Sequence, residues 1–213
     1  MSRILALIIC VAFAGQLYSQ SDWKLVKERE SIEVFTRKAS NSKYKEVKIL
    51  ANFKTTMNEL VAALEDVDTH KDWVPYTIDS YMVKKLNPDK FYYYVSSDFP
   101  FPAKDRDVVI YYERQQNPDT KKVVTHSAAA PDYMETFNDF VRVPVFDSIY
   151  ELTPKDDGTI DINYELKVSP GGSIPAWLIN LGVTKGPIMT MESLVELLDS
   201  GKYRNADVVG ITN

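Results

Sequence analysis

Few residues of this chain have the type and spacing needed for catalysis or metal binding. His70 and His126 are the only histidines, and neither belongs to a metal-binding pattern such as His-Glu-x-x-His. Ser127 follows His126, but successive side chains of a strand point to opposite faces, so the two are not expected to act as a pair. The Gly-x-Ser-x-Gly sequence of hydrolases is absent. We therefore expect no catalytic residue, no metal and no cofactor.

Residues 1–19 read as a secretory signal peptide. Arg3 precedes an apolar run over residues 4–14, which is shorter than the about twenty residues of a membrane span, and small residues suited to cleavage follow. Cleavage near Ser19 would remove Cys10, the only cysteine, and with it any disulfide or thiol chemistry. The pattern predicts a secreted or periplasmic protein.

Composition and charge narrow the class of partner. The chain has a formal net charge of −5 and no basic run, which argues against nucleic acid and against tight docking on anionic lipid. Its 13 tyrosines and 9 phenylalanines suit a cavity for rings or long chains, although aromatic residues are equally common in ordinary β-sheets. Since no linker divides the sequence, we expect one monomeric domain over residues 21–198 and a polar tail over residues 199–213.

Strand patterns dominate the remaining sequence. Apolar and polar side chains alternate over residues 160–168 and over residues 47–53, which predicts strands with one buried face. Turn sequences lie between strand-like runs at residues 87–90, 117–120 and 156–158. Consecutive hairpins of this kind indicate an antiparallel sheet.

Two of the strand-like runs are apolar or aromatic on both faces. They cover residues 91–95 and 108–112. Strands of this composition need cover on both sides, or a cavity on one side.

The predicted helices are few. Thr56 and Glu59 form a capping box ahead of an apolar helical face, and a short helix is expected at residues 70–73. Near the C-terminus, Pro187 stands at a favourable first-turn position before apolar residues spaced three and four apart up to Leu198. The order of elements predicts an α+β fold in which a long curved antiparallel sheet is closed by a C-terminal helix.

Three stretches of this sequence resemble the START family of lipid-transfer domains. Residues 70–73 resemble the family's tryptophan-bearing segment, residues 99–107 its loop that ends in an Arg-Asp pair, and residues 169–180 the start of its C-terminal helix. The resemblance runs over residues 23–198. It implies a helix-grip fold, in which a curved antiparallel sheet and a long C-terminal α-helix enclose an apolar cavity for a sterol, phospholipid, sphingolipid or similar molecule.

One departure from the family bears on the ligand. The resemblance implies that sterol-binding members place an acidic and a basic side chain in the cavity, whereas the matching stretches here offer Tyr93 and Tyr112. This puts sterol recognition in doubt. Tyrosine hydroxyls can still hold a polar head group by hydrogen bonds.

The predicted ligand-binding residues lie on the strands near residues 91–112 and on the C-terminal helix. They are Phe91, Tyr93, Val95, Arg106, Val109, Tyr111, Tyr112, Trp177 and Met191. For Val109 and Tyr111 the prediction extends to their sequence neighbours. A packed core would need the same apolar side chains, and only the resemblance favours a cavity.

Two of these residues have alternative roles. Arg106 could reach a ligand head group with its rigid set of donors. We expect instead that it forms an ion pair with Asp105, Asp107 or another carboxylate and so pins the loop to the sheet. Trp177 would begin the C-terminal helix after an N-cap at Ser173, either as part of a hinged lid or as a packing anchor.

Three functions are compatible with the sequence. The first is an exported lipid-binding or lipid-transfer protein that performs no catalysis and touches membranes transiently. The second is a helix-grip enzyme of the cyclase or aromatase type acting on an aromatic or polyketide substrate, which would need a poised acid or base in the cavity. The third is an interaction domain whose cavity is vestigial.

Overall fold

The structure is a computed structural model that describes residues 22–39 and 44–213. For residues 176–184 it describes the backbone but not the side chains. The predicted signal peptide at residues 1–19 lies outside the described residues.

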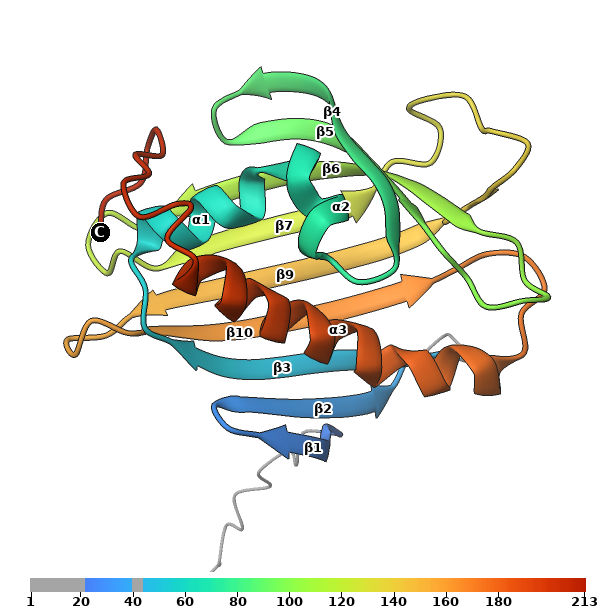
Figure 1. The fold of residues 1–213 in the computed structure, drawn as a ribbon, viewed down its shortest axis with the longest axis horizontal. Helices are drawn as coiled ribbons and strands as arrows, with labels where there is room; N and C mark the ends of the chain where they lie inside the picture. Colours follow the sequence, from blue (N-terminus) through green and yellow to red (C-terminus); the bar gives the residue numbers. More distant parts are fainter. Residues whose placement is uncertain (1–21, 40–43) are drawn as a thin grey trace, which may run out of the picture.

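A single sheet forms most of the described part of the molecule (Figure 1). Its ten strands follow the order β1-β2-β3-β10-β9-β7-β6-β5-β4, with β8 paired in parallel to β6 and the other neighbours antiparallel. The strands are β1 (Lys24–Arg29), β2 (Ile32–Lys38), β3 (Lys45–Phe53), β4 (Thr77–Asn87), β5 (Lys90–Ser97), β6 (Arg106–Gln116), β7 (Val123–Ala129), β8 (Val141–Arg142), β9 (Val145–Pro154) and β10 (Ile160–Ser169).

The predicted strands and turns are confirmed. The two alternating runs become β3 and β10, which pair with each other so that Ile49 lies opposite Tyr164. The three turn sequences connect β4 to β5, β6 to β7 and β9 to β10. Ile49 and Ile162 are almost fully buried, because the apolar side of each alternation faces the helices.

The helices lie over one face of the sheet, which we call the inner face (Figure 1). They are α1 (Met57–Glu65), the 3-10 turn η1 (Val67–Thr69), α2 (His70–Trp73) and α3 (Ala176–Asp199). The predicted capping box is present, since the Thr56 hydroxyl accepts from the Glu59 amide at 3.2 Å and the Glu59 carboxylate accepts from the Thr56 amide at 3.0 Å. The arrangement is the predicted sheet closed by a C-terminal helix.

The start of α3 differs from the prediction in two respects. The helix begins at Ala176, so Pro187 lies in its interior rather than in its first turn. Pro175 occupies the N-cap position and no side chain caps the helix, so Ser173 is not the N-cap. A proline inside a helix removes one backbone hydrogen bond, a local loss that does not prevent a helix held by its packing from continuing.

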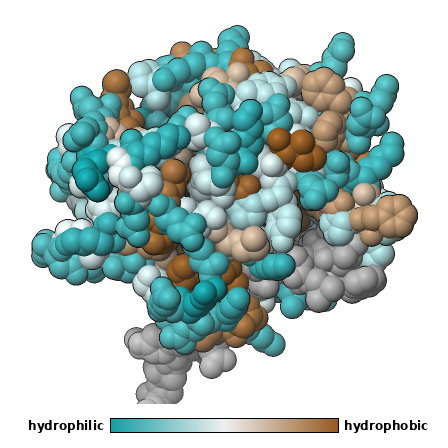
Figure 2. Space-filling view, viewed as in Figure 1, coloured by the Kyte–Doolittle hydropathy of each residue, from teal (hydrophilic) through white to brown (hydrophobic). Residues whose placement is uncertain are grey.

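The apolar core consists of two clusters under the helices. The larger one joins β2, β3 and β10 to α1 and to the second half of α3, where Ile188, Met191 and Leu194 are 3%, 0% and 0% exposed. The smaller one lies on β5 and β6. On the face that carries the helices, hydrophilic side chains dominate the surface and hydrophobic ones form separate patches (Figure 2).

Residues 199–213, predicted as a polar tail, pack against the domain. Ile211 is only 6% exposed and belongs to the larger core cluster. The Asn213 side-chain oxygen accepts from the Asn58 amide at the start of α1 at 3.0 Å. The segment is therefore polar in composition but structurally part of the domain.

Candidate functional site

A cavity of about 250 Å³ separates the inner face of the sheet from α2 and α3. The sheet side is formed by alternate residues of β5, β6, β7, β9 and β10, and the helix side includes Leu64, His70, Trp73, Gly186, Pro187 and Thr190. The cavity lies between the two core clusters, where the helices do not fill the space above the sheet.

Hydroxyl groups line the sheet side of the cavity. Strand register sets Ser127 of β7 directly opposite Ser148 of β9, and in the neighbouring rung Thr125 lies opposite Tyr150. Tyr150 in turn lies opposite Tyr164 of β10, and their rings stack with centroids 4.2 Å apart. All of these side chains face the cavity.

The cavity tyrosines remain uncharged at physiological pH. Burial raises the pKa of Tyr93 to about 12, against a smaller opposing effect of its hydrogen bond with Ser127. Burial also raises the pKa of Tyr150 and of Tyr164, and Tyr164 is hydrogen-bonded to Ser148. These phenols therefore serve as neutral donors and acceptors, not as bases.

His70 is a buried neutral histidine at the helix side of the cavity. Its Nε2 lies 3.1 Å from the carbonyl oxygen of Leu64, which requires that nitrogen to carry the proton and leaves Nδ1 as an acceptor. Burial lowers the pKa of His70 to about 4, with smaller opposing effects from that hydrogen bond, Asp66 and Asp68. Its ring meets Tyr93 edge-to-face with centroids 5.9 Å apart.

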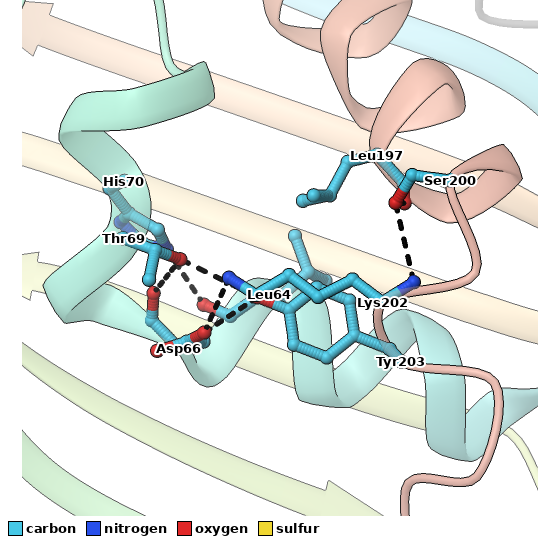
Figure 3. Close-up of polar contacts among 8 residues, drawn as sticks. All are labelled: Leu64, Asp66, Thr69, His70, Leu197, Ser200, Lys202 and Tyr203. Atoms are coloured by element: carbon cyan, nitrogen blue, oxygen red, sulfur yellow. Dashed lines mark hydrogen bonds and ion pairs between the residues drawn. The ribbon is translucent and has the colours of Figure 1, made fainter.

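Figure 3 shows how the region around His70 is tied to the C-terminal segment. The Tyr203 hydroxyl donates to Asp66 at 2.6 Å, and the Lys202 ammonium donates to the same carboxylate oxygen at 3.1 Å. These bonds lower the pKa of Asp66 although burial opposes them. The turn between α1 and α2, and with it the histidine, is therefore held from outside the cavity.

One polar atom of the cavity wall is unsatisfied. Within the part of the chain that the structure describes, the indole Nε1 of Trp73 is buried and has no hydrogen-bond partner. Buried donors in native proteins are normally paired, so this one is an exception beside a cavity.

A buried ion pair lies behind the cavity wall. The Tyr112 hydroxyl donates to Glu65 at 3.0 Å, and Arg114 donates to the same carboxylate oxygen at 2.7 Å. Burial raises the pKa of Glu65, against the lowering effects of Arg114 and Tyr112. Arg114 also donates to the Val209 carbonyl at 3.1 Å, so this side chain links β6 to α1 and to the C-terminal segment.

Of the predicted inward-facing residues of β5 and β6, Tyr93 of β5 and Tyr112 of β6 line the cavity, whereas Phe91 and Val95 do not. Phe91 and Val95 share their face of the sheet and pack in the smaller core cluster, where the Phe91 ring stacks on Tyr112 at 4.4 Å.

Val109 and Tyr111 point to the outer face of the sheet, so their assignment to the cavity wall is corrected. Their neighbours Val108, Ile110 and Tyr112 occupy the inner face. The physical reason is that Tyr133 and Phe137 cover the outer face at this point: Tyr133 stacks on Tyr92 at 3.7 Å, Phe137 meets Tyr94 edge-to-face at 5.7 Å, and Val109 is 0% exposed. A strand covered on both sides is apolar on both sides.

Arg106 lies at the start of β6 and does not line the cavity. It donates to the carbonyl oxygens of Pro170 at 3.3 Å and Gly171 at 3.2 Å, and also to that of Lys104. The expected carboxylate partner is incorrect, because Asp107 instead forms a two-bond ion pair with Arg142, at 3.0 Å for each bond. Arg106 still pins a loop to the sheet, by way of backbone carbonyls.

The two predicted residues of the C-terminal helix have different outcomes. Met191 is fully buried in the larger core cluster, and the described residues of α3 that line the cavity are Gly186, Pro187 and Thr190. Trp177 lies outside the described side chains.

The prediction from sequence missed most of the polar cavity wall. These residues are His70, Thr125, Ser127, Ser148, Tyr150 and Tyr164. The alternation of their strands could have indicated these residues, because each strand residue among them occupies a position that points to the inner face.

Among the described residues, no group of three or more His, Cys, Asp or Glu side chains is arranged to hold a metal ion. No helix in the described part is both long and apolar enough to cross a membrane.

With this geometry established, comparison with known proteins identifies the family. The model of the START domain matches residues 9–202. The chain belongs to the START domain family.

Individual START relatives match over most of their length. An uncharacterized protein of Pseudomonas aeruginosa is 31% identical over 173 residues, which cover 81% of this chain and 85% of that one. The phosphatidylcholine transfer protein of Mus musculus is 26% identical, with 88% of each chain covered. The crystal structure of a STAR-related lipid transfer protein from Xanthomonas axonopodis has a TM-score of 0.77 and 29% identity, with 84% of this chain and 99% of that one covered.

Proposed function

We propose that this START protein binds one lipid-like amphiphile in its cavity and carries it without chemical change. The observation that carries the proposal is the cavity between the sheet and α3, whose wall combines aromatic rings with buried hydroxyl groups. Small-molecule sites have this composition, with mainly apolar walls and a few placed polar groups. The lipid-transfer proteins among its relatives support the same class of ligand.

The cavity is poorly equipped for acid–base catalysis. A general base works best when its pKa lies near the working pH, and His70, with a pKa of about 4, is far below it. The buried tyrosines are shifted in the opposite direction. These shifts favour a carrier over a cyclase or aromatase.

Loading and release require a change in the wall. The cavity of about 250 Å³ is below the range of about 300–1,000 Å³ typical of small-molecule sites, so a larger lipid needs α3 to separate from the sheet. Gly171 and Gly172, before α3, adopt φ values of 69° and 63°, a left-handed conformation that favours glycine. We propose that α3 moves against the loop at residues 100–104.

The same loop offers a site for transient membrane contact. Phe101 is 96% exposed, which is unusual for a large aromatic side chain. A brief insertion of this ring into a bilayer would place the loop and the adjoining end of α3 near the lipid source.

We also propose that the protein is exported and works in the periplasm or outside the cell. The support is the signal-peptide pattern at residues 1–19. Expression of the full chain in a bacterium, followed by mass measurement of the protein in the periplasmic fraction, tests this. A recovered chain that retains residues 1–19 would contradict it.

Native mass spectrometry tests the carrier function. Protein purified without detergent should show the mass of the chain plus one ligand, and an apolar extract should contain one stoichiometric lipid. Ser127→Phe, which fills the cavity, should abolish uptake of a fluorescent lipid. Val124→Phe, on the opposite face of the same strand, is the matched control and should retain uptake. A bare mass together with no uptake of fluorescent fatty acid, sterol or phospholipid would contradict the proposal.

A further inference from the structure

The described part of the cavity wall carries no formal charge. Its described lining residues include no Asp, Glu, Lys or Arg. The sequence of residues 176–184, at the start of α3, likewise contains no ionisable residue, and Lys185, which follows, is exposed. The one histidine of the wall, His70, is neutral at physiological pH because its pKa is about 4.

The nearest buried charges are already engaged. Arg114 and Glu65 pair with each other at 2.7 Å behind Tyr112, and their side chains are 2% and 14% exposed. Arg106 donates to the backbone carbonyls of Pro170 and Gly171, ahead of α3. Neither arginine can turn toward a ligand without leaving a buried partner unsatisfied.

Hydroxyl groups replace charges as the recognition elements. Ser127 and Ser148 face each other across β7 and β9, with Tyr93 bonded to the first and Tyr164 to the second. A hydroxyl both donates and accepts, so this group can satisfy an alcohol, an amide or an ester carbonyl. It supplies no countercharge for a carboxylate, a phosphate or an ammonium.

We propose that the cavity selects amphiphiles whose buried polar group is uncharged, such as an alcohol, amide or ester, and rejects charged head groups. An ion moved from water into a cavity without a countercharge loses hydration that hydrogen bonds from hydroxyls only partly replace. The inference rests on the proposed carrier function and specifies its class of ligand. It separates this protein from carriers of phosphate-bearing lipids.

Four ligands of one chain length test the selection: a fatty alcohol, a fatty amide, a fatty acid and a fatty amine. They compete with a bound fluorescent lipid at neutral pH, below their aggregation concentrations. We expect the alcohol and the amide to bind at least about a hundredfold more tightly than the charged pair. Equal or tighter binding of the fatty acid or the amine would overturn the selection rule.

Failure of the rule is distinguishable from failure of the function. If none of the four ligands binds but the purified protein yields a stoichiometric lipid on extraction, the rule is wrong and the carrier function stands. If a phosphate-bearing lipid is that extracted lipid, the rule is wrong in the same way. If no lipid is extracted and none binds, the carrier function itself is wrong.

A charge placed in the wall should reverse the preference. Ser148→Lys puts an ammonium on the inner face of β9, and we expect it to shift the preference between fatty acid and fatty alcohol by at least about tenfold toward the acid. Thr153→Lys, on the outer face of the same strand, is the matched control and should leave the preference unchanged. Leu166→Lys, at a half-buried wall position, repeats the test if Ser148→Lys does not fold. An unchanged preference in a folded wall variant would contradict the assignment of this wall as the head-group site.

Discussion

The guanidinium of Arg106 donates from Nη2 to the carbonyl oxygen of Gly171 at 3.2 Å. With the bond from Nε to Pro170, it ties the start of β6 to the segment that leads into α3. Arg106 is 3% exposed and its pKa is lowered by burial, so water cannot replace these bonds in the fold. The residue is a clamp on the base of the helix that closes the cavity.

Removal of this clamp should destabilise the protein. Arg106→Leu leaves the carbonyls of Pro170 and Gly171 without their charged donor, and we expect the free energy of unfolding to fall by about 2–4 kcal/mol. Arg106→Lys keeps the charge and should lose less. Urea unfolding measures both changes. Unchanged stability together with lost lipid binding would instead assign Arg106 to the ligand.

Breaking the buried ion pair between Asp107 and Arg142 should lower the free energy of unfolding more than breaking an exposed ion pair. Their side chains are 1% and 8% exposed, so Arg142→Ala leaves a buried carboxylate unpaired and should cost about 3–5 kcal/mol. Lys71→Ala breaks an exposed pair with Asp79 and should cost about 1 kcal/mol or less. Similar losses in the two variants would show that the Asp107 carboxylate is solvated.

The C-terminal segment offers a matched pair of aliphatic residues. Ile211 is 6% exposed and Val209 is 69% exposed. We expect Ile211→Ala to lower the free energy of unfolding by about 2–4 kcal/mol, whereas Val209→Ala changes it by about 0.5 kcal/mol or less. Thermal or urea unfolding measures both. If both variants match the unsubstituted protein, the segment does not contribute to the core.

His70 should make the fold sensitive to acid. Its pKa falls from 6.5 to about 4 on folding, so between these values the unfolded chain binds a proton that the folded chain does not. Stability should therefore decrease as the pH is lowered from about 6.5 to about 4, by roughly 3 kcal/mol. The raised pKa of Glu65 opposes this trend, so the comparison with a variant is what isolates the histidine.

Urea titrations at several pH values in that window provide the measurement. His70→Gln can still donate to the Leu64 carbonyl and should remove most of the acid sensitivity. His126→Gln, on the outer face beside Asp147, should keep it. Parallel pH profiles for the unsubstituted protein and His70→Gln would contradict this prediction.

Gly186 tests whether α3 must flex for ligand exchange. It lies beside Pro187 in the cavity wall, and a methyl group added to it meets no atom within 4 Å. Gly186→Ala restricts the backbone next to Pro187 and should slow the exchange of a fluorescent lipid between vesicles. Glu196→Ala, at an exposed position of the second half of α3, should leave exchange unchanged. Equally fast exchange in both variants would place the flexible point elsewhere.

Periodicity in the sequence predicted the sheet well, and the limits of that prediction have physical causes. The alternation in β10 specified which of its faces is buried, because Ile160 and Ile162 lie on the same side of the strand. In β6, Val109 and Ile110 are both buried, so alternation could not tell the inner face from the outer face, which Tyr133 and Phe137 cover. That cover is a tertiary contact between distant segments and leaves no local pattern.

The candidate site was harder to predict than the fold. Asp105 and Asp107 flank Arg106 in the sequence, yet a strand directs neighbours to opposite faces. Two of the three carbonyls that bind Arg106 come from Pro170 and Gly171, just after β10. Ser127 and Ser148 look unremarkable in sequence, and only the register of β7 with β9 brings them together. Strand pairing, which periodicity does not specify, creates the polar wall.

The pairing of β3 with β10 has a consequence for the time course of folding. Ile49 pairs with Tyr164 although all of β4 to β9 lies between them in the sequence. Closure of so distant a pair is entropically costly, and folding dominated by such contacts takes about milliseconds to seconds. Because Gly186, Pro187 and Thr190 of α3 complete the cavity wall, the cavity cannot close before this late segment of the chain has been synthesised and has packed onto the sheet.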